Sequence, residues 1–381
     1  MLNLGRMATI PITTIAAQHE LVENQLLDAF AERLFSQSFI AGEEVTAFEQ
    51  EFAQFCGSRY AIATNSGTTA LVAALSALQL RSTDEVITTP LSFSATADAI
   101  ILAGGKPVFA DIDPLTGNLD PKKVEQAITS KTKAVIVVHL YGVPANMKRL
   151  KAICKRAGIM LIEDASHAHG SEYEQQTVGS LADIGCFSLY PAKIMGALGN
   201  AGIITTSNPD LAAVIRSYCH HGLEASAEAI IGEKYHHVRV GINGGMDAIQ
   251  AAALRIKLPF LPEWIQSRRQ IADRFSQMLR QHEQNPMYIP EIDKTSLYTY
   301  AFRSTQREEL RRYFSALQIE TRIYYPVLIP LLPSYFSYKF RATLFPVAQQ
   351  WAQTVVSIPL YQNMPAPHQH RILTALDEFF S

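Results

Sequence analysis

The feature that most constrains the fold is a series of short apolar segments between residues 60 and 206 that alternate with helical patterns. Several segments are apolar almost without interruption, as expected for strands that helices cover on both faces. They are YAIAT (60–64), EVITT (85–89), PVFAD (107–111), KAVIVVHL (133–140), IMLIED (159–164), GCFSL (185–189) and GIITT (202–206). Strand–helix alternation predicts right-handed crossovers and a mostly parallel sheet flanked by helices, which is the α/β class.

The remaining helical patterns suggest how the chain is divided. Helices are expected at 43–57, 68–78, 146–158, 246–258 and 262–281. The last hundred residues show only two strand-like segments, 297–303 and 355–359, with helices at 305–318 and 366–380. A chain of 381 residues is long enough for two domains. We therefore predict a large α/β domain, residues 1–255, and a smaller C-terminal α+β domain, residues 256–381.

Composition excludes several classes of partner. The chain has 33 Lys and Arg against 35 Asp and Glu, so its formal net charge of -2 gives no reason to expect a nucleic acid or a membrane surface. The four cysteines lack metal-knuckle spacing, and no two histidines have the i, i+4 spacing of a paired metal site, so no metal is expected. The N-terminal segment lacks the apolar block of a signal peptide, and no run could cross a bilayer. We expect a cytoplasmic protein with free thiols.

Candidate site residues follow the strands, because ligands of a parallel sheet bind at its carboxyl ends. After 60–64 comes NSGTTAL (65–71), where the N–H groups of Gly67 and Thr68 could seat a phosphate at a helix N-terminus. The same residues would also serve as an ordinary helix cap. After 85–89 comes Phe93, which could stack on a flat ring or simply pack in the core.

Two carboxylates end the segment 159–164. Glu163 and Asp164 are neighbours in a strand, so their side chains leave on opposite faces and only one is expected to face a ligand. A half-buried carboxylate needs a cationic partner, such as the protonated nitrogen of a pyridine ring. The alternative is that Asp164 caps the turn that follows.

Lys193 lies four residues after the segment 185–189, among small and apolar neighbours. A lysine in a partly desolvated pocket has a lowered pKa and can form a Schiff base as a neutral nucleophile. Ser188 could add a hydroxyl group to a phosphate site. A solvated surface lysine is the alternative, but the glycines at 196, 199 and 202 favour a tightly shaped turn.

These segments, in this order, resemble the fold-type I pyridoxal-phosphate (PLP) enzymes and, within them, the DegT/DnrJ/StrS nucleotide-sugar aminotransferases. The resemblance covers nearly the whole chain. It is carried by the run from FIAGEE to NSGTTAL (39–71), VIVVHLYGVPANM (135–147), IEDASHAHGS (162–171), FSLYPAK (187–193), GINGGMDAIQAAALRIKLP (241–259), IYYPVLIPLLPSY (323–335) and SIPLYQNMP (357–365).

The resemblance implies a role for each candidate residue. Lys193 would hold PLP and then carry protons, and Asp164 would pair with the pyridine nitrogen. The other implied cofactor contacts are Phe93 stacked on the ring, His167 beside its hydroxyl where a glutamine is usual, Gly67, Thr68 and Ser188 on the phosphate, and Asn243 from the neighbouring subunit of a homodimer. Lys234, Tyr235 and Tyr325 match stretches that line the sugar-nucleotide site.

The implied reaction moves an amino group from glutamate to a keto-sugar carried by a nucleotide. The stretch MGALGNAG (195–202) resembles members that act at C-3, which favours a dTDP-linked 3-keto-6-deoxyhexose over amination at C-4. A catalytically silent, regulatory PLP-binding protein is the alternative of another class. A dehydratase is disfavoured because such members carry histidine where Lys193 stands, and a nicotinamide dehydrogenase lacks its G-x-G-x-x-G. Departures from the family pattern fall where the sugar nucleotide is expected, at Asn200, Ala201, Gly244, Gly245, Pro330 and Leu332.

Overall fold

The computed structural model describes residues 8–223, 236–282 and 292–381. Its centre is a seven-stranded sheet with the strand order β1-β9-β8-β5-β4-β2-β3. The strands are β1 (Tyr60–Thr64), β2 (Glu85–Thr88), β3 (Lys106–Phe109), β4 (Thr132–Val138), β5 (Met160–Asp164), β8 (Ile184–Ser188) and β9 (Gly202–Thr206). Every strand expected in this region is present, and the α/β class is confirmed.

One strand runs against the others. The pairs β2–β3, β2–β4, β4–β5 and β5–β8 are parallel, whereas β9 is antiparallel to both of its neighbours, β8 and β1. No helix separates β8 from β9, so the chain returns beside β8 instead of crossing over a face of the sheet. The segment that makes this return, residues 189–201, carries Lys193.

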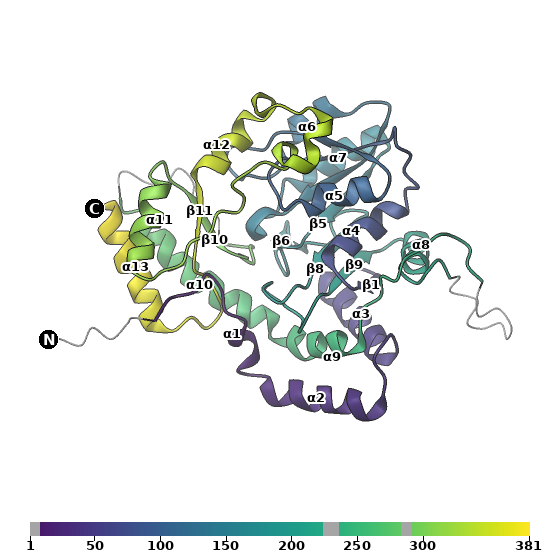
Figure 1. Cartoon of the computed structure of the whole chain (residues 1–381), viewed down its shortest axis with the longest axis horizontal. Coiled ribbons are helices and arrows are strands. Elements are labelled where there is room, and N and C mark those ends of the chain that lie inside the picture. Colours follow the sequence, from purple (N-terminus) through teal and green to yellow (C-terminus); the bar gives the residue numbers. More distant parts are fainter. Residues whose placement is uncertain (1–7, 224–235, 283–291) are drawn as a thin grey trace.

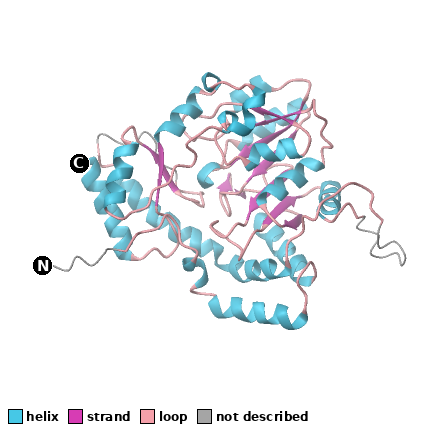
Figure 2. Ribbon diagram, viewed as in Figure 1, coloured by secondary structure: helices cyan, strands magenta, loops and turns pink. Residues whose placement is uncertain are grey.

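Helices cover the sheet on both faces, as Figure 2 shows. One face packs against α3 (Glu43–Cys56), α6 (Pro121–Ala127), α7 (Met147–Ala157) and α9 (Ala248–Lys257). The other packs against α4 (Gly67–Ser76), α5 (Ala95–Leu102) and α8 (Pro209–Cys219). Strand residues alternate between the two cores, so that Leu161 belongs to the first and Ile162 to the second.

Local sequence signals explain where several helices begin and end. The side chain of Asn146 accepts a hydrogen bond from the Arg149 N–H at the start of α7, and Gly158 ends this helix with a φ of 65°. Asn208 caps α8 by accepting from the N–H groups of Asp210 and Leu211. Such caps satisfy backbone groups that a helix leaves unpaired at its ends.

The C-terminal part has its own sheet and core. Its antiparallel strands are β10 (Tyr300–Arg303) and β11 (Val355–Ile358), and its helices are α10 (Leu261–Leu279), α11 (Arg307–Ala316), α12 (Pro346–Thr354) and α13 (Ala366–Phe380). In Figure 1, α10 runs from beside α9 toward α11 and α13. Its first half packs in the core of the large sheet through Leu261 and Ile265, and its second half in the C-terminal core through Phe275 and Leu279. The predicted division between residues 255 and 256 stays a prediction.

The N-terminal region has helices that no pattern in the sequence predicts. It forms the short helix α1 (Ala16–His19) and the longer α2 (Glu23–Ser36). Ile10 belongs to the C-terminal core, and its N–H donates to the Gln318 carbonyl at 2.9 Å. The strand pair β6 (Glu172–Tyr173) and β7 (Gln176–Thr177) and the 3-10 turns η1 (Leu140–Gly142), η3 (Leu258–Phe260), η4 (Ile329–Leu331), η5 (Pro333–Tyr338) and η6 (Ala342–Leu344) complete the described elements.

Two features are absent from the described residues. No helix there combines the length and apolarity needed to cross a membrane. No group of three or more His, Cys, Asp or Glu side chains there has an arrangement that could hold a metal ion.

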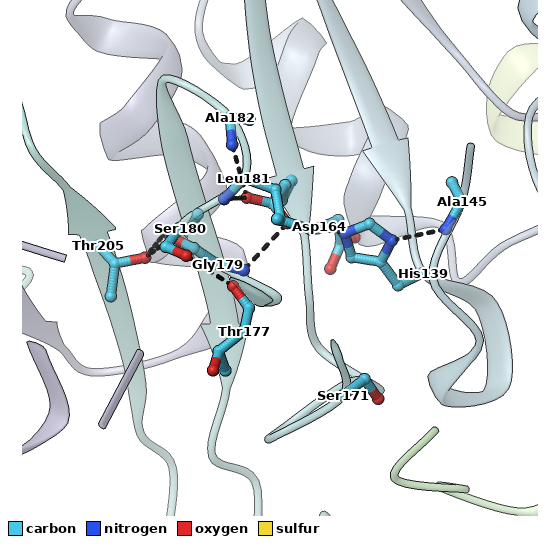
Figure 3. Close-up of polar contacts among 12 residues, drawn as sticks. His139, Ala145, Asp164, Ser171, Thr177, Gly179, Ser180, Leu181, Ala182 and Thr205 are labelled. Carbon is cyan, nitrogen blue, oxygen red and sulfur yellow. Dashed lines mark hydrogen bonds and ion pairs between the residues drawn. The ribbon is translucent and has the colours of Figure 1, made fainter. Parts of the chain in front are cut away.

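Glu163 is a fully buried anchor at the end of β5. Its carboxylate accepts hydrogen bonds from the N–H groups of Gly179, Leu181 and Ala182 at 3.0, 2.9 and 2.9 Å, and lies 2.9 Å from His139 Nε2. Figure 3 shows His139, Gly179, Leu181 and Ala182 around the end of the strand that carries Asp164. The carboxylate thus ties the loop before β8 to β5.

Replacing this anchor tests its contribution to stability. Glu163→Ala leaves buried N–H groups without an acceptor, and we expect it to lower the free energy of unfolding by about 3–5 kcal/mol. Glu125→Ala, which removes only an exposed ion pair with Arg156, is the control and should change it by at most about 0.5 kcal/mol. Urea denaturation measures both, and equal effects would contradict the role of Glu163 as an anchor.

Candidate active site

A cavity of about 480 Å³ opens at the carboxyl ends of β5 and β8 and is closed on one side by α4 and α5. The structure brings most of the predicted site residues to this cavity. The predicted site residues that line it are Gly67, Thr68, Phe93, Asp164, His167, Ser188, Lys193 and Tyr325. Residues from sequence segments more than 250 positions apart therefore meet in one place.

Asp164 faces the cavity, on the sheet face opposite to Glu163. It is 4% exposed, and its carboxylate accepts a hydrogen bond from Thr96 Oγ1 at 2.7 Å and from the Ser166 N–H at 3.2 Å. Thr96 Oγ1 is also 3.2 Å from Ser92 Oγ. Asp164 therefore has a fixed orientation as well as a charge. The bond from Ser166 agrees with the turn-capping alternative, and the two roles are compatible.

Lys193 lies in the turn between β8 and β9 and reaches the same cavity. Its backbone N–H donates to the Tyr190 carbonyl at 2.8 Å, and its Nζ lies 4.5 Å from the centre of the Tyr298 ring. Burial lowers the pKa of Lys193 to about 8, while the charge of Asp164 acts in the opposite direction. More of the amine is consequently neutral, and nucleophilic, near neutral pH than in an exposed lysine.

The N-terminus of α4 meets Ser188 in the wall of the cavity. Ser66 caps the helix by accepting from the Thr69 N–H at 3.0 Å, whereas the N–H groups of Gly67 and Thr68 have no partner within the helix. A Cβ on Gly67 would lie 2.6 Å from the Ser188 Cβ, so only glycine allows this approach. Two helix N–H groups and a hydroxyl form a seat for a phosphate.

Aromatic side chains also line the cavity. Phe93 is 60% exposed, and its ring centre is 6.2 Å from that of Tyr325. The His167 ring stacks on Tyr298, with centres 4.2 Å apart and an angle of 10° between the planes. Burial and then the charge of Lys193 hold the pKa of His167 well below its usual range, so the imidazole is neutral. Its Nδ1 is buried without a hydrogen-bond partner among the described residues, as a donor to a ring hydroxyl would be.

Three of the predicted site residues are not in the cavity lining. Asn243 is exposed, and its carbonyl accepts from Asn65 Nδ2 at 3.1 Å beside the start of α4. Lys234 and Tyr235 lie outside the described residues. Among the departures from the family pattern, Asn200 and Ala201 line the cavity. Pro330 instead lies in the 3-10 turn η4, and Leu332 lies between η4 and η5, where it packs in the same hydrophobic cluster as Tyr335.

The cavity also contains residues that the sequence did not indicate. Thr96, which orients Asp164, stands only three positions after Phe93, so the same segment held a signal for it. Tyr190 is also close in sequence to Lys193. Tyr298 and Tyr324 come from the C-terminal part, and no local pattern links them to the lysine or the carboxylate.

Fold and cavity together define a fold-type I PLP-dependent enzyme. More particularly, the chain belongs to the DegT/DnrJ/EryC1/StrS aminotransferase family, whose model matches residues 21–377. A relative from Geobacillus stearothermophilus, called a pleiotropic regulatory protein, is 34% identical over 374 residues, which are 97% of this chain and 98% of the relative. UDP-2-acetamido-2-deoxy-3-oxo-D-glucuronate aminotransferase from Pseudomonas aeruginosa is 36% identical over 352 residues, 92% of this chain and 95% of the relative.

Among solved structures, DesV from Streptomyces venezuelae superposes with a TM-score of 0.93. It is 31% identical, and the match covers 98% of this chain and 99% of DesV. PLP is the cofactor of this family, and a solved member holds it in the pyridoxamine form. The cavity fits that group, because it offers N–H groups and a hydroxyl for the phosphate and an imidazole nitrogen without a hydrogen-bond partner among the described residues, that of His167. It also offers the oriented carboxylate of Asp164 and the buried amine of Lys193. When bound, PLP withdraws electrons from the substrate carbon next to nitrogen.

The lowered pKa of Lys193 predicts how PLP capture depends on pH. The neutral amine is the reactive form, so the rate at which PLP-free protein captures PLP should rise with pH and level off above about 8. The anion of Asp164 favours the charged amine, so in Asp164→Asn the pKa of Lys193 should fall and the midpoint should move to lower pH. Stopped-flow absorbance measures the midpoint.

The control for this measurement is Lys193→Arg, which keeps a positive charge but cannot form the covalent link to PLP. The absorbance change that reports PLP capture should therefore be absent in this variant. A midpoint that stays in place in Asp164→Asn would mean that the two groups do not interact across the cavity.

Proposed function

We propose that this protein transfers the amino group of glutamate to the keto carbon of a nucleotide-linked keto-6-deoxysugar, with a dTDP-linked 3-keto-6-deoxyhexose as the favoured acceptor. One observation carries the proposal: the amine of Lys193 and the carboxylate of Asp164 face the same cavity. A lone buried lysine or a lone buried carboxylate would have a structural explanation. Their combination with a phosphate seat gives each a partner at a different part of one flat ring.

In this proposal, each chemical task falls to a side chain. Asp164, held by Thr96, keeps a positive charge on the ring nitrogen of the cofactor. Lys193 accepts a proton at Nζ and returns it to a neighbouring carbon, a task that a pKa of about 8 suits because both protonation states are accessible. Gly67, Thr68 and Ser188 hold the phosphate, and His167 donates to the ring hydroxyl.

The exposed ring of Phe93 covers the cofactor, and Tyr325 is its neighbour. Tyr325 and the residues Lys234 and Tyr235 are proposed to contact the sugar nucleotide. Burial raises the pKa of Tyr325, so its hydroxyl stays protonated and can donate a hydrogen bond.

The position that receives nitrogen is proposed from the chain's own turn and from its relatives. The turn after Lys193 has the glycine-rich sequence MGALGNAG, and the relative from Pseudomonas aeruginosa is named for a 3-oxo sugar. Relatives are named for both UDP and dTDP sugars, so the experiment below compares sugars linked to each of the two nucleotides.

We also propose that the protein works as a cytoplasmic homodimer with both sites at the interface. Large apolar side chains stand exposed along and after α2, and they are Leu27, Phe30, Leu34, Phe35, Phe39 and Ile40. A second copy would remove this surface from water. Asn243 is exposed beside the start of α4, where it can reach a neighbouring molecule. The four free, buried cysteines agree with a reducing compartment.

A transamination screen tests the proposal. PLP-loaded protein is incubated with glutamate and a panel of dTDP- and UDP-linked 3-keto and 4-keto sugars, and NMR locates the nitrogen in the product. We expect the largest kcat/KM for a dTDP-linked 3-keto-6-deoxyhexose and an amine at C-3.

Lys193→Ala is the control and should form no product with any sugar. Nitrogen at C-4 would replace the proposed acceptor by its alternative. Failure of the PLP form to react even with glutamate alone would favour the silent, regulatory protein, a role for which one relative is named.

A further inference from the structure

The turn that carries Lys193 is held from outside by two buried polar side chains. One is Gln18 of α1, which is 3% exposed, and the other is Lys257 of α9, which is fully buried. Neither lines the cavity, and neither was indicated by the sequence. Both contact the backbone of the turn between β8 and β9.

Gln18 uses both ends of its amide on this turn. Its Nε2 donates to the carbonyl oxygen of Lys193 at 2.7 Å, and its Oε1 accepts from the N–H of Gly196 at 3.1 Å. The amide thus bridges two positions one turn apart, like a helical hydrogen bond supplied from another segment. Within the turn itself, the Lys193 N–H donates to Tyr190 and the Ala197 N–H to Leu189, each at 2.8 Å.

Gly196 lies where the turn packs closely against its own backbone. A Cβ there would lie 2.2 Å from the carbonyl oxygen of Pro191, so no other residue fits without moving the backbone. Its carbonyl accepts from Lys257 Nζ at 2.6 Å, and the same Nζ is 3.0 Å from His19 Nε2. The N–H and the carbonyl of Gly196 are therefore both bound to side chains from other helices.

Gln18 lies in a short helix, and both partners of its side-chain amide are in the lysine turn. The helix α1 has only four residues, of which Ala17 and Gln18 are buried, while Ile15 and Leu21 on either side are 40% and 57% exposed. A buried amide is costly unless its polar atoms are paired, and here the lysine turn supplies both partners. The chain before α1 is bound to the C-terminal part, where the Leu360 N–H donates to the Ile12 carbonyl at 3.2 Å.

We propose that Gln18 is a positioning residue for Lys193. By bridging the Lys193 carbonyl and the Gly196 N–H, it sets where the base of the lysine side chain stands and so where the amine meets the cofactor and the substrate carbon. This inference rests on the proposed role of Lys193. It assigns to the N-terminal segment a part in the chemistry, although none of the described residues of that segment lines the cavity.

Two substitutions separate the bonds that Gln18 makes. Gln18→Met has a similar length but makes neither bond. Gln18→Glu keeps an acceptor for the Gly196 N–H and, when ionised, loses the donor to the Lys193 carbonyl. Gln54→Met makes the same change at an exposed position of α3 and is the matched control.

Three measurements use the full-length protein. The first is the rate of PLP capture by PLP-free protein, which needs no sugar substrate. The second is the single-turnover half-reaction with glutamate, for which kcat here means the limiting rate and KM the glutamate concentration that gives half of that rate. The third is amide hydrogen exchange at Gly196.

We expect Gln18→Met to slow both PLP capture and kcat by about 10- to 100-fold, because a small displacement of a reacting group has effects of this size. KM for glutamate should stay within about 2-fold, since the side chain does not contact substrate. Gly196 should exchange faster in Gln18→Met but stay protected in Gln18→Glu, which should nevertheless lose kcat. Gln54→Met should match the wild type.

Two results would overturn the inference. Wild-type capture and kcat in Gln18→Glu at every pH, including high pH where the carboxyl is ionised and cannot donate, would mean that the bond to the Lys193 carbonyl is dispensable. A loss that appears equally in kcat and in KM would mean that Gln18 supports the cavity in general. If Gln18→Met is too unstable to purify, Gln18→Glu alone decides. Failure of the wild type to aminate any sugar would refute the proposed function but leave the capture experiment valid.

Discussion

The site depends on a constraint at the end of β5, where two consecutive carboxylates leave the strand on opposite faces. Glu163 is buried and fully paired with backbone N–H groups and His139, so it fixes the position of the strand end. Asp164 points to the other face, where Thr96 holds it against the cavity. Two adjacent acids thus have separate tasks. Glu163 holds the loop before β8, and Asp164 places a negative charge at the cavity.

The one strand that departs from the parallel order is also the one that shapes the lysine turn. A crossover helix after β8 would have carried the chain away from the carboxyl edge of the sheet. Instead, β9 returns beside β8, and the intervening segment remains at the edge with Lys193 in it. The close approach of Gly202 to Ser66, with a Cβ position only 2.4 Å from the Ser66 carbonyl oxygen, brings this return against the start of α4. The phosphate-binding residues and the lysine are therefore neighbours because β9 runs antiparallel to β8.

The cavity is built from both parts of the chain. The large sheet supplies the carboxylate, the lysine and the phosphate seat, whereas Tyr298, Tyr324 and Tyr325 come from the C-terminal part. Arg268 of α10 fastens this aromatic wall, since its guanidinium donates to the carbonyls of Leu297 and Tyr298 at 2.9 and 2.8 Å. Because α10 belongs to both cores, the position of these tyrosines relative to Lys193 is tied to the packing of the whole molecule.

The sequence by itself determined the strands of the large sheet and which residues follow them, because apolar runs and period-two alternation are local signals. That was enough to place Gly67, Phe93, Asp164 and Lys193 at one edge. It did not determine the direction of β9, which depends on whether a connection crosses the sheet. Nor did it indicate Tyr298 or Gln18, whose contacts with Lys193 join residues 105 and 175 positions apart. Such contacts and the burial that lowers the pKa of Lys193 arise only when distant segments pack together, so the tertiary structure decided them.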